Sequence, residues 1–328
     1  MALSIAQIEA VCAIVRSNFN FSAAAVALDR SQPTLSRQVQ ELERALGVRI
    51  FTRSRNKVVA LTPKGEEILR IGQRMLRDAR NLAEVGRADA AEDSGELRVA
   101  TSHLHARYAL PRVMKTFAAR FPGVALTLRQ GDPVRCCEFV AAGDADIGVT
   151  TVGEKFAGEI VTIPAYRLAR CVIAQRGHPL AREKNLTLKK LAAFPLVAYS
   201  APYSGRAIVD EAFARAGLKP RVVCSAIDAD VSKTYVEIGM GIAILANIVF
   251  DPARDRGLVA MDAGHLFRPS IINLVMRRHA YLSRQALAFV SLFAPHLAAG
   301  LVRKAIDGGD IDRAKLAREA PLATRDLC

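Results

Sequence analysis

Apolar residues near the start of the chain recur every three or four positions, which is the period of amphipathic helices. Residues 4–17 predict a first helix. A second is expected from its cap Ser22 through Leu28, and a third from its cap Ser31 to Gly47, a residue suited to end a helix. One face of the third helix is an apolar stripe made of Leu35, Val39, Leu42 and Leu46. The pattern therefore predicts three short helices packed together.

The other face of the third helix is polar. Its first turns, in which proline is tolerated, offer side chains suited to base edges and phosphates: Gln32, Thr34, Ser36 and Arg37. A basic cluster follows, where a wing could contact the DNA backbone: Arg53, Arg55 and Lys57. Between Asp29 and Lys64 there are eight basic and three acidic residues, which modestly favours a polyanionic partner. The pattern predicts a winged helix-turn-helix, and leaves open a three-helix domain with a solvated basic face.

A long helix is expected to begin at Pro63 and run to about Ala91. Its apolar positions alternate by three and four residues, which is the seam of a helix pair. Such a helix is hard to keep stable alone, so a dimer is expected through it. The alternative is a long helix packed on its own domain. The polar stretch Ala88–Gly95 then predicts a hinge between domains.

From Glu96 the pattern changes to alternating strands and helices. A first series predicts a βαβαβ unit with parallel strands: strands 97–101, 124–128 and 145–150, helices 108–121 and 134–142. A second series is longer: strands 168–174, 196–199, 222–225 and 242–245, helices 188–193, 204–216 and 230–238. A late strand over 271–276 and a helix over 284–297 follow, and the helix is expected to return to the first lobe. Two α/β lobes joined by crossing strands make a hinged cleft, a common setting for small ligands. The mostly polar residues beyond 298 predict a weakly ordered terminus.

Composition narrows the class of protein. The formal net charge is +14, and residues 94–296 carry 26 basic and 16 acidic residues, a net of +10. That excess suits an acidic small ligand or contact with DNA, and a solvated basic surface explains it equally well. The six cysteines form no Cys-x-x-Cys pair, so no metal site is expected. No apolar run reaches about 18 residues, and Gln7 and Glu9 argue against a signal peptide, so a cytoplasmic protein without membrane contact is expected.

Two turns rich in hydroxyl groups are expected at the cleft. Thr101–Tyr108 follows the first strand, and Ser200–Arg206 follows strand 196–199 and leads into a helix. In parallel α/β sheets ligands bind beyond such strand ends, where helix N-termini favour anions. A neutral or anionic polar ligand is therefore expected there. Ordinary helix capping by Ser102 and Ser204 is the alternative reading of the same hydroxyls.

An enzyme is not expected. His103 and His105 are two residues apart, but no third metal ligand follows from the spacing. The sequence contains no nucleophile elbow and no phosphate-binding loop, and Gly239 and Gly241 indicate a helix stop before a strand. Salt-sensitive retention of DNA would distinguish a regulator from a solute-binding protein with the same two-lobe layout.

The N-terminal motifs resemble those of LysR-type transcriptional regulators. The residues that carry the resemblance are Ser31–Val39, Leu42-Glu43, Leu46-Gly47, Phe51–Arg53, Leu61–Pro63 and Gly65. The resemblance covers residues 1 to about 92. It implies a winged helix-turn-helix over 1–62, a dimerisation helix over 63–92 and a two-lobed, periplasmic-binding-protein-like α/β effector domain over 93–328. It assigns DNA contacts to Ser31, Gln32, Pro33, Thr34, Ser36, Arg37, Arg53 and Arg55.

Within the effector domain, the resemblance implies a first lobe over about 96–165 and 270–297, a second over about 166–269 and a tail over 298–328. Further motifs resemble the CysB-like branch of the family: Ala106–Pro111, Gln130–Pro133, Ser204–Arg206, Ile227–Val231, Lys233–Val236 and Phe293–Leu297. That branch contains regulators of sulfur assimilation, so the effector implied is sulfate, thiosulfate, an acetylserine or a sulfonate. The effector-binding residues inferred in this way are Thr101, Ser102, Leu104, His105, Gln130, Thr150 and Ser204.

One turn departs from the branch. Leu104-His105 stands where the branch usually has Thr-Gln, which removes a hydroxyl and changes an amide to an imidazole. Losing one hydrogen-bond donor changes affinity by ~1–3 kcal/mol, so the effector can differ from that of other members. Our hypothesis is that His105, partly protonated near neutral pH, attracts an anion. A LysR-type regulator of an unrelated pathway is the alternative.

The resemblance also implies partners. These are promoter DNA, a second copy of the chain through the long helix with assembly to a tetramer, RNA polymerase, and the small effector. No other cofactor is implied. A regulator of this kind activates some promoters and represses its own gene.

Overall fold

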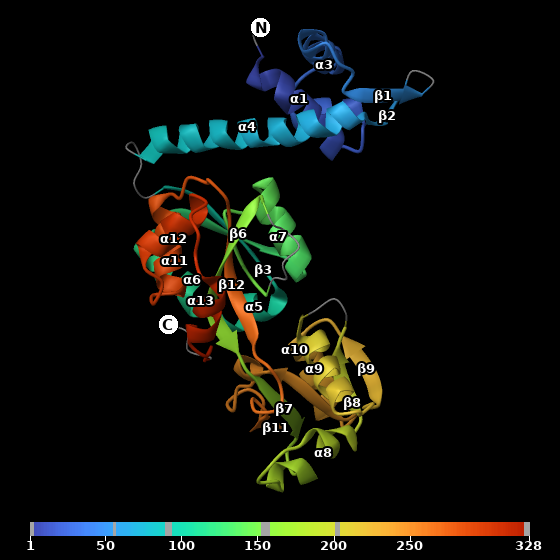
Figure 1. The fold of residues 1–328 in the computed structure, drawn as a ribbon, viewed down its shortest axis with the longest axis vertical. Coiled ribbons are helices and arrows are strands. Elements are labelled where there is room, and N and C mark those ends of the chain that lie inside the picture. The colour runs from blue at the N-terminus through green and yellow to red at the C-terminus, as the bar shows by residue number, and fades with distance from the viewer. Residues whose placement is uncertain (1–2, 55–56, 89–93, 152–157, 201–203, 325–328) are drawn as a thin grey trace. The chain divides into compact units, whose positions relative to one another are not determined.

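The computed structural model describes residues 3–54, 57–88, 94–151, 158–200 and 204–324. The chain divides into two compact units, residues 1–91 and 92–328, each with its own hydrophobic core (Figure 1). None of the described helices is long and apolar enough to cross a membrane.

The first unit consists of helices and a small hairpin: α1 (Ile5–Arg16), α2 (Phe21–Ala27), α3 (Gln32–Leu46), β1 (Phe51–Ser54), β2 (Lys57–Leu61) and α4 (Pro63–Ala88). Ser31 caps α3 by accepting the Thr34 N–H, and Gly47 ends it at a φ of 67°, as the sequence predicts. The predicted cap of α2 is wrong. Asn20 rather than Ser22 begins that helix, because its side chain accepts the Ala23 N–H at 3.1 Å.

The second unit contains two α/β lobes. Lobe I contains β3 (Ser94–Thr101), α5 (His103–Tyr108), α6 (Pro111–Arg120), β4 (Gly123–Gln130), α7 (Pro133–Ala142), β5 (Ile147–Thr150), β6 (Ile160–Leu168), β12 (Ser270–Arg277) and α11 (Arg284–Phe293). Its sheet order is β4-β3-β5-β12-β6. Strands β3, β4 and β5 are parallel, as the predicted βαβαβ unit requires, and β12 runs antiparallel to β5 and β6.

Lobe II contains β7 (Arg170–Gln175), η2 (Pro179–Arg182), α8 (Leu188–Ala192), β8 (Leu196–Tyr199), α9 (Ser204–Arg215), β9 (Val222–Ala226), α10 (Ala229–Glu237), β10 (Ile242–Ala246), η3 (Asn247–Val249) and β11 (Leu258–Asp262). Its sheet order is β11-β7-β10-β8-β9. The chain passes between the lobes twice, from β6 to β7 and from β11 to β12 (Figure 1). Two crossing segments therefore join the lobes, as expected.

Several elements of the second unit differ from the sequence prediction. The helix expected over 108–121 is two helices, because Pro111 offers no N–H and starts α6 afresh, while the Leu110 N–H bonds back to His105 and ends α5. Strand β6 was missed because Pro164 interrupts its apolar run; β6 is an edge strand, where proline is tolerated. Strand β11, another edge strand, was also missed.

Residues 299–324 are ordered, contrary to the prediction for the C-terminal segment. They form α12 (Ala299–Ile306) and α13 (Arg313–Glu319). Val302, Ala305 and Ile306 are buried at helical spacing in the main core cluster. Beyond α13 the backbone pairs with β6, because the Arg167 N–H donates to Pro321 and the Ala323 N–H donates to Arg167. The apolar positions of α12, hidden among polar residues, explain why the segment packs.

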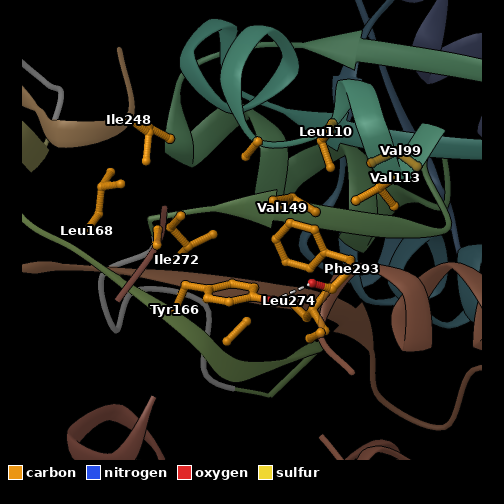
Figure 2. Packing of buried hydrophobic residues seen from close by; sticks show 14 of the residues in the cluster. Val99, Leu110, Val113, Val149, Tyr166, Leu168, Ile248, Ile272, Leu274 and Phe293 are labelled. Atoms are coloured by element: carbon orange, nitrogen blue, oxygen red, sulfur yellow. Dashed lines mark hydrogen bonds between the residues drawn. The ribbon is translucent and has the colours of Figure 1, made fainter. Parts of the chain in front are cut away.

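One core cluster extends from lobe I through the crossing strands into lobe II. Figure 2 shows its centre, where the Tyr166 hydroxyl on β6 donates to the Phe293 carbonyl at 2.8 Å and the two rings meet edge to face. Leu168, at the end of β6, and Ile248, in lobe II, belong to the same cluster. Continuous packing at the crossing fixes the strand ends from which cleft residues project.

Candidate DNA interface and effector cleft

The residues predicted to contact DNA gather at the exposed start of α3. Four of them are exposed and adjacent: Ser31, Gln32, Pro33 and Thr34. Ser36 is half-buried and Arg37 is exposed one turn further on. The first turn is locally ordered, since the hydroxyls of Ser31 and Thr34 lie 2.7 Å apart. Leu35 and Val39 on the opposite face are fully buried, so packing of the apolar stripe turns the polar face outward.

Arg37 is already engaged along its own helix. Its Nε donates to Glu41 at 2.9 Å, and this bond is the largest cause that lowers the pKa of the Glu41 carboxyl. An exposed pair of this kind contributes little to stability, so the guanidinium can exchange its carboxylate for a phosphate. Arg53 is exposed on β1, whereas Arg55 lies outside the described residues. The basic wing is thus described in part.

A cavity of about 50 Å³ lies between the two lobes of the second unit, with room for a group the size of a few water molecules. Lobe I and the crossing segments contribute Ser102, His103, Leu104, His105, Pro133, Thr151, Leu168 and Ser270. Lobe II contributes Arg170, Tyr199, Gly205, Ile227, Asp228 and Ala246. The strand ends and helix starts predicted to form the cleft do meet there.

The seven predicted effector residues divide into four groups. Ser102, Leu104 and His105 line the cavity. Thr101 and Thr150 are fully buried behind it, and Thr101 donates its hydroxyl to the Val149 carbonyl at 2.9 Å; Thr151 lines the cavity instead. Gln130 is exposed at the end of β4 and is not among the lining residues. Ser204 begins α9, but its side chain is outside the described residues; its neighbour Gly205 lines the cavity.

His105 is neutral, which corrects our hypothesis of an imidazolium. The side chain is 2% exposed, and burial, partly opposed by the Val149 carbonyl, lowers its pKa from 6.5 to about 4. Its Nδ1 lies 2.9 Å from the Ser102 hydroxyl. The Ser102 side chain does not cap α5, and its hydroxyl forms a hydrogen bond with His105 instead. Near pH 7 this pair offers polar atoms without charge.

A cation lines the cavity at Arg170, a residue to which the sequence patterns assign no function. It begins β7, is 3% exposed and stays charged at physiological pH, although burial lowers its pKa. Its Nη2 donates to the Ser270 hydroxyl at 2.5 Å and its Nη1 to the Leu168 carbonyl at 3.3 Å. Nε has no hydrogen-bond partner, and no carboxylate of a described residue pairs with the guanidinium. The sequence does carry a signal for this residue, because Arg170 is a charged residue within the otherwise apolar predicted strand 168–174.

His103, Asp228 and Asp230 lie close enough to consider a metal ion, with ligand atoms within 4.8 Å of one another. The carboxylates of both aspartates already have partners. Asp228 caps α10 by accepting the Val231 N–H at 2.9 Å, and Asp230 lies 2.6 Å from Arg107 Nε. Because a neighbouring guanidinium repels a cation, this cluster does not favour a metal.

Comparison with known proteins decides the family. Residues 5–66 match the model of the bacterial regulatory helix-turn-helix protein, lysR family, and residues 90–298 match the LysR substrate binding domain. The chain belongs to the LysR family. It is therefore a ligand-responsive, DNA-binding transcriptional regulator and not an enzyme.

Relatives of this LysR-type regulator place it in the CysB-like branch. It is 44% identical to the HTH-type transcriptional regulator SsuR of Burkholderia cenocepacia over 92% of this chain and 99% of that protein. It is 38% identical to the regulator CysB of Haemophilus influenzae over 91% of this chain and 92% of that protein. A solved structure of the cofactor-binding domain of the Cbl transcriptional regulator covers 65% of this chain and 94% of its own, with 34% identity and a TM-score of 0.62.

Proposed function

We propose that this LysR-type regulator controls genes of sulfur assimilation or of sulfonate and sulfate-ester use. Its effector is a small anion or an acetylserine-like molecule, held between the lobes. Membership of the CysB-like branch supports the pathway. The observation that carries the choice of effector is Arg170, a buried guanidinium facing the cavity without a described carboxylate partner.

A buried charge without a counter-charge is costly, because transfer from water removes hydration that nothing replaces. An oxoanion in the cavity supplies the missing charge and accepts hydrogen bonds from the guanidinium, which suits planar oxygen pairs. Ser102 and Ser270 add hydroxyls to the same lining. The small volume favours a compact sulfate-like or sulfonate group at this point, with any larger remainder of the effector directed out of the cavity.

We further propose that residues 1–62 read the operator and that 93–328 sense the effector. The readers of the groove are Ser31, Gln32, Pro33, Thr34, Ser36 and Arg37, with Arg53 and Arg55 on the backbone. The effector residues are those proposed from the sequence, Thr101, Ser102, Leu104, His105, Gln130, Thr150 and Ser204, with Arg170 and Ser270 added. Three of the seven, with Arg170 and Ser270, line the cavity, which supports these more directly than the rest.

Pairing of two copies through residues 63–92 is part of the proposal, as are assembly to a tetramer and contact with RNA polymerase. One face of α4 supports the pairing. Leu76 and Gly72 are buried in the first unit, where Gly72 packs closely on Ile8. In contrast, Ile71, Met75 and Leu82 are exposed by 43%, 39% and 74% and lie near one stripe of the helix. A second copy would cover that stripe and fix the spacing of two reading helices.

The test is a thermal-shift and calorimetric titration of the full chain with sulfate, thiosulfate, O-acetylserine, N-acetylserine and simple sulfonates. One of these is expected to stabilise the protein saturably, by ~2.7 kcal/mol at about 100 times its dissociation constant. Arg170→Gln is expected to weaken that ligand at least about tenfold, since hydrogen bonds to charged groups contribute ~1.5–3 kcal/mol. Arg176→Gln, at an exposed arginine just after the end of β7, is the matched control.

The alternative is a LysR-type regulator of an unrelated pathway. The turn at Leu104 favours it, because this apolar side chain lines the cavity where the branch usually has a hydroxyl. Absence of any saturable shift across the panel, on a protein that binds DNA, would reject the sulfur effector and leave this second reading.

A further inference from the structure

A cluster of charged and polar side chains connects α5 of lobe I with α10 of lobe II. The Tyr108 hydroxyl donates to Asp230 Oδ1 at 2.6 Å, and Arg107 Nε lies 2.6 Å from Asp230 Oδ2. One oxygen of this lobe II carboxylate therefore accepts a hydrogen bond and the other forms an ion pair, both with adjacent residues of lobe I. We call these contacts of Arg107 and Tyr108 with Asp230 the interlobe clasp.

The lobe II side of the clasp is fixed in place. Lys233 is 7% exposed, and its Nζ donates to the Val249 carbonyl at 3.0 Å and to Asp255 at 2.9 Å. The same Nζ lies 3.5 Å from Asp230 Oδ1 and 5.4 Å from the centre of the Tyr108 ring. Burial tends to raise the pKa of Asp230, but Tyr108, Lys233 and Arg107 together hold it below its usual range. Asp230 is therefore an ionised acceptor near neutral pH.

Both helices of the clasp also reach the effector cavity. Ser102–His105 lead into and begin α5 and line the cavity, while Arg107 and Tyr108 at its other end make the clasp. Asp228, the cap of α10, lines the cavity, and Asp230 follows two residues later. A shift of either helix that accompanies ligand binding must therefore move the clasp, because each helix is a short rigid segment.

The geometry points to a role for Arg107, Tyr108 and Asp230 as positioning residues that set the angle between the lobes and couple it to effector binding. The clasp does not contact the effector. It stabilises the arrangement of the lobes in which the lining residues of both lobes face one another, and so raises the population of that arrangement. Apparent affinity falls in proportion to the fraction of protein in the competent arrangement. Loss of the clasp is expected to weaken the effector about tenfold. This coupling rests on the proposed effector cleft.

Two variants of the full chain test the clasp. Asp230→Asn keeps an acceptor oxygen for Tyr108 but removes the charge that holds Arg107, and Tyr108→Phe removes only the hydroxyl. The matched controls are Glu211→Gln and Tyr235→Phe. Glu211 pairs with Arg215 and Arg268 within lobe II alone, and Tyr235 is a half-exposed tyrosine of α10.

The first readout is amide hydrogen exchange without ligand, followed by mass spectrometry. Exchange in α5 and α10 is expected to accelerate in both clasp variants, with the sheets of both lobes unchanged and the controls like wild type. The second is affinity for whichever anion of the sulfate-to-sulfonate panel stabilises wild type most. If no anion binds, the proposed effector fails, while exchange still decides whether the clasp holds the lobes.

Three results would overturn the inference. One is that amide hydrogen exchange in α5 and α10 is as slow in Asp230→Asn as in the control Glu211→Gln. Another is acceleration spread through all of lobe II with a lowered melting temperature, which would make the cluster merely structural. The last is unchanged anion affinity despite faster exchange of α5 and α10, which would separate the clasp from effector binding.

Discussion

His105 Nδ1 lies 2.9 Å from Ser102 Oγ, and the ring is buried at the start of α5. The folded pKa of about 4 lies below the ordinary 6.5, so the fold favours the neutral ring. The resulting stability is fully present above about pH 6.5 and is lost as pH falls toward 4, with a limit of ~3 kcal/mol. Chemical denaturation from pH 7.5 to 4 should show that His105→Gln reduces this loss. An equal slope in wild type and variant would contradict the assignment.

The neutral ring also affects ligand binding. Because His105 carries no charge near neutral pH, affinity for a fully ionised anion such as sulfate should stay constant between pH 8 and 6. An imidazolium at its ordinary pKa would instead raise affinity as pH fell through 6.5. Calorimetry at several pH values in one buffer ionic strength distinguishes the two. A clear rise in affinity toward pH 6 that disappears in His105→Gln would restore the charged histidine.

Glu43 should be a stability residue of the first unit. It is 7% exposed and its Oε1 accepts the N–H groups of Ile50 at 2.7 Å and Phe51 at 3.3 Å, which joins the end of α3 to β1. Glu43→Ala leaves two buried donors unsatisfied and should lower the free energy of unfolding by ~2 kcal/mol. Glu41→Ala, two residues away, is the control: Glu41 is only partly buried and pairs with the exposed Arg37, so the denaturation midpoint should stay nearly unchanged.

Two glycines of the first unit should differ in their tolerance of alanine. A Cβ on Gly65 would lie 2.1 Å from the Ile50 carbonyl oxygen, so α4 would have to move away from the hairpin. Gly65→Ala should cost ~3 kcal/mol. Gly47 has open space around it and only the φ of 67° to maintain, so Gly47→Ala should cost ~1 kcal/mol. Urea denaturation of both variants measures the two losses in free energy of unfolding. A larger loss for Gly47→Ala than for Gly65→Ala would contradict this prediction.

The exposed stripe of α4 should control self-association. Met75→Ser with Leu82→Ser removes apolar contacts that a second copy would make, so the proposed dimer should dissociate at a higher protein concentration than that of the wild type. Light scattering coupled to size exclusion measures this. Arg74→Ser, exposed on the same helix, should leave the assembly unchanged. Identical dissociation of both variants would move the interface away from this stripe.

Periodicity and local chemistry predicted much of the fold. Ser31 and Gly47 bound α3 because capping depends on the local backbone alone. Edge strands were harder to predict, because Pro164 interrupts the apolar run of β6. Helix α12 was not predicted because polar residues separate its apolar positions. The cleft turns were found because they follow strand ends, but burial cannot be read along a sequence. That is why His105 was given a charge and why Arg170, a long-range partner of Ser270, was overlooked.

The bond between Arg170 and Ser270 connects the two places where the chain crosses between lobes. A side chain at one crossing therefore bonds to a side chain at the other, at the place where any change of lobe angle has to be accommodated. An anion bound to Arg170, as proposed, would therefore act directly at the crossing between the lobes. Occupancy of the cavity and the angle between the lobes would then be set at the same place in the chain.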